Sequence, residues 1–244
     1  MKKYSLVTTH YCTNCSCSSK EELIQRFNYD GSIDDLYINF SNKFDPWNVD
    51  NINIGNSGRK DLIYGKIFLL KEFIENNLLN KYEYICHIDY SDTKFSKSFI
   101  EMMQDFEYTK QDFIISSEKN CWPNIDIVQK WVKYPLENKD FEYLNSGAVI
   151  SKTQVYYEYL KELIDICLST PIDFWDDQGV WQYYNLNVNR LNIDKNCKYF
   201  FSTGLLDNTY FNIDNDKKIT TKFNTHPYLI HDNSSFSLNL INKI

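Results

Sequence analysis

The feature that most constrains the fold is a regular alternation of strand-like and helix-like segments through the first half of the chain. Short apolar runs, typical of buried strands, occupy residues 4–9, 35–40, 84–88 and 113–116. Segments with the apolar spacing of a helix face lie between these runs, at residues 20–27, 62–77 and 96–106. This order predicts an α/β sheet that binds its ligands at the carboxyl ends of the strands.

The second half of the chain is expected to complete the same unit. Residues 143–150 are predicted to form a further strand, residues 152–167 a helix, and the residues beyond them shorter strands. The sequence shows neither an internal repeat nor a low-complexity linker, and 244 residues are enough to bury one core. We therefore expect a single domain over residues 1–244.

The charge and hydropathy of the chain limit its partners. The net charge is −7 and the pI is near 5.2, whereas binding to nucleic-acid phosphates requires clustered Lys and Arg. We therefore expect no nucleic-acid partner, and an anionic substrate would require a metal ion. No apolar run reaches the roughly 20 residues of a membrane span, and no apolar segment of a secretory signal follows Met1. The expected location is the cytoplasm of the producing or host cell.

Two carboxylates directly follow the strand at residues 84–88, in the sequence His87-Ile-Asp89-Tyr-Ser-Asp92. Carboxylates that converge at a strand end suit a hard divalent cation, which could neutralise the phosphates of a nucleotide bound to an acidic protein. The alternative is that Asp92 or Ser91 caps the next helix. Spacing alone leaves both interpretations open.

Two further polar segments accompany strands. Trp122, in a Trp-Pro pair, follows the strand at residues 113–116, where its indole could face a base or a sugar ring or could pack in the core. Residues 143–147, with the sequence Tyr-Leu-Asn-Ser-Gly, open the next strand either as a close-approach site for a ligand or as a turn. Residue type decides neither case.

Adjacent carboxylates occur at Asp176 and Asp177, immediately before Gln178. In a strand, neighbouring side chains point to opposite faces, so at most one of the two would face a substrate. A helix that starts here would be the exception, and its dipole would also favour acidic residues in the first turn. Catalysis and a helix-end role are both open for this pair.

Histidine and cysteine add two weaker metal signals. His231 follows an apolar segment near the end of the chain, and a single His is usually not a ligand. His10, Cys12, Cys15 and Cys17 lie within eight residues, a spacing too cramped for the usual zinc fingers, so we favour an ordinary loop there. The seven cysteines are an odd number and are expected to be reduced.

Taken together, the order and spacing of these segments resemble the N-terminal glycosyltransferase domain of the multifunctional procollagen lysyl hydroxylases. The matching pieces are Lys66 with the helix after it, Asp89-Tyr-Ser-Asp92, Cys121-Trp-Pro123, Tyr143-Leu-Asn-Ser-Gly147, Asp176-Asp-Gln178, Asp194-Lys-Asn-Cys-Lys-Tyr-Phe200 and His231-Asp-Asn233. The resemblance implies a GT-A-type, Rossmann-like α/β fold with a mixed sheet flanked by helices, here as a stand-alone domain.

The resemblance also implies an activity, the Mn²⁺-dependent, retaining transfer of glucose from UDP-glucose to galactosyl-hydroxylysine of collagen-like chains. The residues implied to bind Mn²⁺ are Asp89, Asp92 and His231. The residues implied to line the sugar and acceptor pocket, as catalytic residues, are Trp122, Asn145, Asp176, Asp177 and Gln178. The residues expected to bind the nucleotide are Thr8, Thr9, Lys66, Tyr90 and Asn233.

The chain departs from the family pattern in two places. The aromatic residue inside the Asp-x-x-Asp motif is Tyr90, the second residue of the motif, whereas the family has it third. Ser237 occupies the position of a family Lys, so the phosphate contact of that Lys is either missing or supplied by another residue, for which Lys66 is the candidate. The sequence also ends where the family continues into its hydroxylase part, and we expect no oxygenase activity.

Two other functions remain open at this point. One is a UDP-sugar transferase that acts on another glycan or a free sugar. The other is a non-catalytic module that binds a nucleotide sugar or a glycan. The presence of both motif carboxylates together with Asp176, Asp177 and Gln178 favours an enzyme. A homodimer is left open as the assembly.

Overall fold

The computed structural model describes residues 2–10, 20–40, 63–89, 92–132, 140–204 and 206–233. The strands in these ranges are β1 (Lys2–His10), β2 (Leu36–Phe40), β3 (Tyr82–Asp89), β4 (Thr93–Phe95), β5 (Phe113–Glu118), β6 (Tyr143–Lys152), β7 (Phe200–Ser202), β8 (Phe211–Ile213), β9 (Ile219–Thr221) and β10 (Leu229–His231). The helices are α1 (Lys20–Phe27), α4 (Leu70–Asn77), α5 (Phe99–Tyr108), α6 (Ile125–Gln129), α7 (Thr153–Ser169) and α8 (Asp177–Asn187), with a 3₁₀ turn, η1 (Ile33–Asp35), and a π-helical segment, η2 (Tyr64–Leu69).

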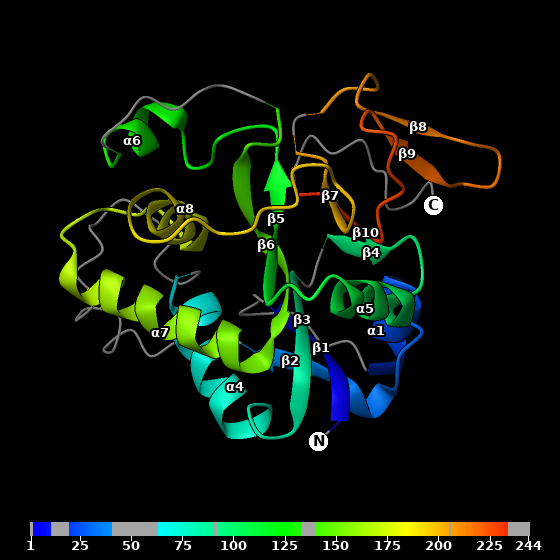
Figure 1. The fold of residues 1–244 in the computed structure, drawn as a ribbon, viewed down its shortest axis with the longest axis horizontal. Helices are drawn as coiled ribbons and strands as arrows, with labels where there is room; N and C mark the ends of the chain where they lie inside the picture. Colours follow the sequence, from blue (N-terminus) through cyan, green and yellow to red (C-terminus); the bar gives the residue numbers. More distant parts are fainter. Residues whose placement is uncertain are drawn as a thin grey trace.

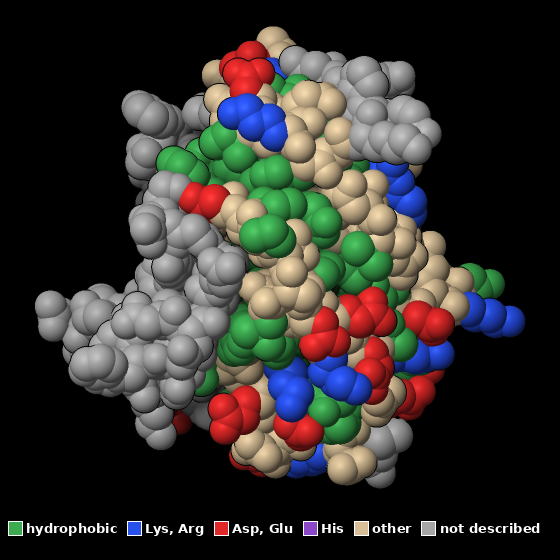
Figure 2. Space-filling model, turned by 90° about the vertical axis from the view of Figure 1, so that its left-hand side faces the viewer, with side chains coloured by type: hydrophobic (Ala, Val, Ile, Leu, Met, Phe, Trp, Pro, Cys, Tyr) green, Lys and Arg blue, Asp and Glu red, His purple; other side chains and the backbone are tan. Residues whose placement is uncertain are grey.

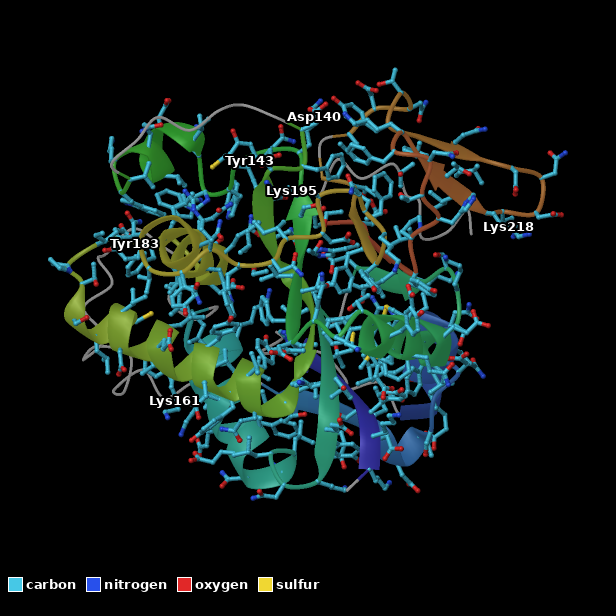
Figure 3. The ribbon with its side chains drawn as sticks, in the orientation of Figure 1. Asp140, Tyr143, Lys161, Tyr183, Lys195 and Lys218 are labelled. Atoms are coloured by element: carbon cyan, nitrogen blue, oxygen red, sulfur yellow. The ribbon has the colours of Figure 1, made fainter. Side chains whose placement is uncertain are left out.

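The central sheet has the strand order β2-β1-β3-β6-β5. β1 runs parallel to β2 and β3, whereas β6 runs antiparallel to both β3 and β5. The carboxyl ends of β1, β3 and β5 therefore meet the amino end of β6 at one edge, which lies at the top of the sheet in Figure 1 and which we call the carboxyl edge. Tyr143, labelled in Figure 3, marks the start of β6 there.

Two helical layers cover the sheet because successive strand side chains alternate between its faces. On β1, Leu6 packs in a buried cluster with Leu23 of α1 and Met102 of α5. The next residue, Val7, packs in the opposite cluster, which includes residues of α4, α7 and α8 such as Leu160. Figure 1 shows these two groups of helices on opposite sides of the strands. The result is the mixed sheet flanked by helices that was predicted.

A second, three-stranded sheet has the order β4-β10-β7. β10 pairs antiparallel with β4, so that His231 lies opposite Thr93, and it pairs parallel with β7. The hairpin of β8 and β9 extends beyond this sheet, with Lys218 at its outer end in Figure 3. The small sheet matters for function because it brings residue 231 beside the segment that follows β3.

The strands and helices predicted in the first half of the chain are present, with shifted ends. The helix predicted over residues 62–77 begins as the π-helical segment η2 and continues as α4. The helix predicted from residue 96 begins only at Phe99, because the backbone N–H groups of Ser96 and Lys97 donate to the carbonyl of Tyr228, at 2.8 and 3.4 Å. The turn-rich residues 54–58 and the cluster Cys12, Cys15 and Cys17 lie outside the described residues.

α8 was not among the predicted helices. Its buried positions include apolar residues such as Val180 and Trp181 and polar residues such as Gln182 and Asn185. A helix that is buried on several sides with mixed polarity lacks the one-sided apolar stripe that reveals a helix in a sequence. The first two residues of this segment, Asp176 and Asp177, lie at the helix start, which was the exception considered for the acidic pair.

The surface on the side of α7 and α4 mixes apolar and charged groups. Figure 2 shows hydrophobic side chains in the middle of this face, and Lys, Arg, Asp and Glu side chains of both signs close together below them. The charged side chains of α7 include the ion pair of Lys161 with Glu158, at 2.8 Å. Among the helices of the described ranges, none is long and apolar enough to cross a membrane.

Candidate active site

The three predicted metal ligands lie together at the carboxyl edge. Asp89 is the last residue of β3, Asp92 precedes β4, and His231 ends β10. The pairing of β10 with β4 places His231 opposite Thr93, and the N–H of Asp232 donates to the carbonyl of Asp92 at 2.7 Å. Segments more than 130 positions apart in the chain are thus held in register by backbone hydrogen bonds.

The ligand atoms of Asp89, Asp92 and His231 all lie within 4.8 Å of one another. The His231 Nε2 atom is 3.4 Å from Asp92 Oδ1 and 3.6 Å from Asp89 Oδ2. Both His231 Nε2 and Asp92 Oδ1 are buried, and neither has a hydrogen-bond partner among the residues that the structure describes. Buried polar atoms without a partner are costly, and a cation held between them would satisfy both.

The donor set and its charge fit a divalent cation such as Mn²⁺. Two carboxylate oxygens and one imidazole nitrogen are ligands that this ion accepts. Burial alone would lower the pKa of His231, but the carboxylates of Asp92 and Asp89 outweigh it and raise that pKa. The position therefore attracts positive charge. The helix-cap alternative for Asp92 and Ser91 is wrong, because the side chain that caps α5 is that of Ser98, which accepts from the N–H of Glu101 at 3.0 Å.

Lys66 lies beside this cluster on the π-helical segment η2. Its ammonium nitrogen is 2.7 Å from Asp89 Oδ1 and 3.5 Å from Asp177 Oδ2. Burial would raise the pKa of Asp89, but the Lys66 ammonium and His231 outweigh it and hold that pKa below its usual range. Lys66 thus connects the metal-ligand cluster with the acidic pair at the start of α8.

The acidic pair forms the start of α8. Asp176 is the N-cap residue, and its Oδ1 accepts from the N–H of Gly179 at 3.0 Å. Burial, and then the neighbouring charge of Asp177, raise the pKa of Asp176 to about 6. Burial also raises the pKa of Asp177, against the effect of Lys66. The two carboxyl groups are both buried, and Asp177 Oδ2 accepts from the hydroxyl of Ser146 at 2.7 Å.

Trp122 contacts the acidic pair from the loop after β5. Its indole Nε1 donates to Asp176 Oδ2, and the residue is 48% exposed. The core-packing alternative for Trp122 is therefore wrong. A half-exposed indole fixed by a hydrogen bond to a buried carboxylate is free to offer its ring to a ligand from outside.

Glu118, the last residue of β5, joins three of the predicted site residues and was missed in the sequence. Its buried carboxylate accepts from the side-chain amides of Gln178, of Asn145 at 3.4 Å and of Asn233 at 3.1 Å. Burial raises the pKa of Glu118 to about 7, although these hydrogen bonds act in the opposite direction. A signal was present, since a charged residue ends an otherwise uncharged strand at the carboxyl edge.

The remaining predicted nucleotide-binding residues lie at the end of β1. Thr9 is in register with Asp89 on β3, and its hydroxyl is 2.8 Å from His87 Nε2. Burial lowers the pKa of His87 to about 4, so its ring is neutral near pH 7. The hydroxyl of Thr8 is buried and has no hydrogen-bond partner in the described part of the chain. Tyr90 lies outside the described residues.

Comparison with known proteins identifies similar chains. The family model described as the PLOD GT domain matches residues 18–244. A curated relative, the uncharacterized protein R699 of Acanthamoeba polyphaga mimivirus, is 26% identical over 102 residues, which are 41% of this chain and 20% of that protein. The chain thus corresponds to only about a fifth of that relative's length.

Two solved structures share the fold across nearly their whole length. One is a glycosyltransferase involved in the glycosylation of the major capsid of PBCV-1, with 12% identity, a TM-score of 0.50 and coverage of 96% of this chain and 95% of that chain. The other is mouse xyloside xylosyltransferase 1 in its apo form, with 12% identity, a TM-score of 0.51 and coverage of 97% and 99%. The predicted GT-A-type fold is thereby confirmed.

Proposed function

The chain belongs to the family of PLOD GT domains and is a glycosyltransferase, and from this premise we propose that it transfers glucose from UDP-glucose, with Mn²⁺, to galactosyl-hydroxylysine of collagen-like chains with retention of configuration. The observation that carries the proposal is the convergence of Asp89, Asp92 and His231 within 4.8 Å, next to Lys66. A module that only binds a nucleotide sugar would use the same metal ligands, but it would not need the adjacent buried acidic pair of Asp176 and Asp177.

In this proposal Asp89, Asp92 and His231 hold Mn²⁺. The bound ion supplies positive charge for the pyrophosphate of the donor, which becomes the leaving group. Support comes from the buried His231 Nε2 and Asp92 Oδ1 atoms, which lie 3.4 Å apart and have no hydrogen-bond partner among the described residues. Two oxygens and one nitrogen leave further coordination positions for phosphate oxygens and water.

We assign Lys66, Thr8 and Thr9 to the donor nucleotide. The Lys66 ammonium is already fixed between Asp89 and Asp177 in the protein, so it requires little reorganisation to stabilise charge on a departing phosphate. The hydroxyls of Thr8 and Thr9 lie near the carboxyl end of β1, where α/β sheets bind nucleotides, and that of Thr8 has no partner within the described ranges. We keep Tyr90 and Asn233 as proposed contacts of the same ligand.

We assign Asp176, Asp177 and Trp122 to the sugar. Asp177 is held by Ser146 and Lys66 in the interior, where a carboxylate can stabilise the positive charge that builds up at the anomeric carbon. Trp122 positions the sugar or acceptor ring on its exposed face and holds Asp176 through its indole N–H. Gln178 orders the inner side of the pocket through Glu118.

A second candidate acceptor is another glycan. The two structural neighbours, named for capsid glycosylation and for transfer to xyloside, share the fold over almost all of this chain. The same donor chemistry at Asp89, Asp92 and His231 would serve either acceptor, because the acceptor is bound by other groups. The acceptor must therefore be identified by assay.

The test offers UDP-glucose or UDP-galactose with Mn²⁺ to a galactosyl-hydroxylysine peptide, a bare hydroxylysine peptide and free sugars, and identifies products by mass. We expect glucose on the galactosylated peptide and strong rejection of the bare peptide, because buried groups built to pair with galactose hydroxyls would lack partners. EDTA and Asp89→Ala should both abolish transfer, whereas Asp165→Ala on the exposed side of α7 should not. Glucose transfer only to free sugars would favour the second acceptor class, and nucleotide binding without UDP release would indicate a binding module.

A further inference from the structure

The side chain of Asn145, on β6, is buried and forms hydrogen bonds with three other groups of the protein. The residue is 2% exposed. Its Oδ1 atom lies 3.0 Å from His231 Nδ1 and 2.9 Å from the backbone nitrogen of Gly147. Its Nδ2 atom lies 3.4 Å from Glu118 Oε2. Both ends of the amide are therefore already used by groups of the protein.

These contacts determine which way the amide of Asn145 points. A backbone N–H can only donate, so the atom that faces the nitrogen of Gly147 must be the carbonyl oxygen. With the oxygen in that position, the amide nitrogen faces Glu118 Oε2 and donates to it. The amide orientation thus follows from the backbone N–H of Gly147, whose role as a donor is fixed.

The orientation of Asn145 in turn decides the state of the His231 ring. Because the Asn145 oxygen can only accept, His231 must carry a proton on Nδ1. In a neutral imidazole the lone pair is then on Nε2, the atom that faces Asp92 at 3.4 Å and Asp89 at 3.6 Å. The ring is thereby presented to the metal-ligand cluster in the form that binds a cation.

We propose that Asn145 is a positioning residue that acts through His231, holding the ring in its metal-binding tautomer and orientation, and that it does not contact the sugar or the acceptor. This inference rests on the proposed function, because it assumes that His231 binds Mn²⁺. Glu118 serves the same purpose one step further out, since it fixes the amide of Asn145. The motif at residues 143–147 is then a support for the metal site, not a turn.

Two neighbours restrict the ring from other directions. Gly147 lies against it so closely that a Cβ atom at this position would be 2.1 Å from His231 Cε1. The backbone of His231 is paired with β4 and β7. The ring is therefore placed by its strand, by the close approach of Gly147 and by one hydrogen bond, and Asn145→Ala removes only the hydrogen bond. Loss of such an outer partner of a metal-bound His typically costs about 10- to 100-fold in metal affinity.

The test measures Mn²⁺ affinity by electron paramagnetic resonance of the free ion, with UDP at a saturating concentration, and needs no turnover. We expect Asn145→Ala to weaken Mn²⁺ binding by roughly 10- to 100-fold and to regain much of its transfer rate at high Mn²⁺. The matched control is Asn185→Ala, which removes another buried Asn. Its side-chain oxygen accepts from the N–H of Leu191 at 2.9 Å and contacts none of the three metal ligands. This control should retain the Mn²⁺ affinity of the wild type.

A second pair of variants keeps the inference testable if Asn145→Ala does not fold. Asn145→Asp retains the acceptor for His231 but sets a carboxylate against Glu118, so it should bind Mn²⁺ less tightly than the wild type. Adding Glu118→Gln restores a donor between the two side chains and should recover affinity by several fold. If Asn145 had only a structural role, exchanging the donor and the acceptor between residues 145 and 118 would not restore the Mn²⁺ affinity.

The outcomes separate the inference from the function on which it rests. Wild-type affinity in Asn145→Ala, together with a loss of transfer that high Mn²⁺ does not repair, would overturn the positioning role and return Asn145 to the sugar pocket. Absence of Mn²⁺ binding in the wild-type protein would overturn the metal assignment itself, and with it the inference. Weakened Mn²⁺ binding in Asn145→Ala and in Asn145→Asp, with recovery when Glu118→Gln is added to Asn145→Asp, would support both the positioning role of Asn145 and the metal assignment.

Discussion

Replacement of Gly147 by Ala should damage the metal site through a steric effect alone. The backbone of Gly147 does not adopt the left-handed region, so Ala would be unstrained there in the absence of neighbours. A Cβ atom at this position would, however, lie 2.1 Å from Cε1, 2.7 Å from Nδ1 and 2.8 Å from Nε2 of His231. Whichever part moves, the present position of the ring is incompatible with the added methyl group.

The size of the displacement follows from these distances. Carbon atoms in contact prefer a separation of at least about 3.5 Å, so the ring must move away by roughly 1.4 Å from its position 2.1 Å from the new atom. β6 is paired with β3 and β5 and cannot easily retreat instead. Metal-ligand distances tolerate deviations of only about 0.2 Å. The displaced ring should therefore no longer bind the ion.

We expect Gly147→Ala to weaken Mn²⁺ binding by about 100-fold or more, since the ligand itself is lost and not only its outer partner. The free energy of unfolding should fall by about 1–3 kcal/mol, the usual cost of overpacking. Electron paramagnetic resonance of free Mn²⁺ measures the first quantity and urea denaturation the second. A control variant must therefore show that a loss of stability of this size does not by itself weaken Mn²⁺ binding.

Gly31→Ala provides the matched control. A Cβ atom at Gly31 would lie 2.3 Å from Cζ of Tyr29, an equally severe overlap with an aromatic ring, in the segment between α1 and η1. This variant should lose a similar amount of stability and keep the Mn²⁺ affinity of the wild type. If Gly147→Ala binds Mn²⁺ as tightly as the wild type, the placement of His231 against Gly147 is not needed and the reasoning fails.

Three further predictions concern charge and positioning. Burial raises the pKa of Glu118 from 4.5 to about 7, so the folded state binds a proton that the unfolded chain releases; stability should fall by about 3 kcal/mol from pH 4.5 to 7, and Glu118→Gln should flatten that slope in denaturation series. Lys66→Met should cost about 3 kcal/mol of stability in metal-free protein at pH 7, because it leaves two buried carboxylates without their cation. This loss should shrink as the pH is lowered and Asp177, whose pKa is raised, and then Asp89, whose pKa is lowered, become protonated. Lys161→Met in a surface pair should cost under about 1 kcal/mol, and equal losses in the two variants would contradict the buried pairing. Trp122→Phe keeps an aromatic ring but loses the donor to Asp176, so kcat should fall about 10- to 100-fold with UDP affinity retained, and a collapse of UDP affinity would instead place Trp122 against the base.

Local sequence patterns determined the order of elements. The apolar run before Asp89 and the helical spacing of residues 20–27 appear in the structure as β3 and α1, because burial of one face imposes a period that neighbouring residues display directly. The same locality explains why the carboxylates at Asp89 and Asp92 could be recognised as a pair. Their position at a strand end follows from a few adjacent residues.

The order of motifs along the chain also made the resemblance to the family recognisable, and this resemblance identified His231 as a candidate metal ligand. The residues around His231 could not identify it as a ligand, because a single His after an apolar segment is common in proteins that bind no metal. Its place beside Asp89 depends on the pairing of β10 with β4 across more than 130 residues. Such a contact is decided by backbone hydrogen bonds between distant segments, which no periodicity records.

Only the tertiary structure decided the polar network behind the site. Glu118, Asn145 and Gln178 come from three different elements, and each side chain alone has an ordinary explanation at a strand end or a helix start. Folding removes all three from water at once, so their donors and acceptors must satisfy one another, and this requirement fixes the orientation of Asn145 and hence of His231. The sequence determines which groups are available, but the exclusion of water in the folded chain determines which of them pair.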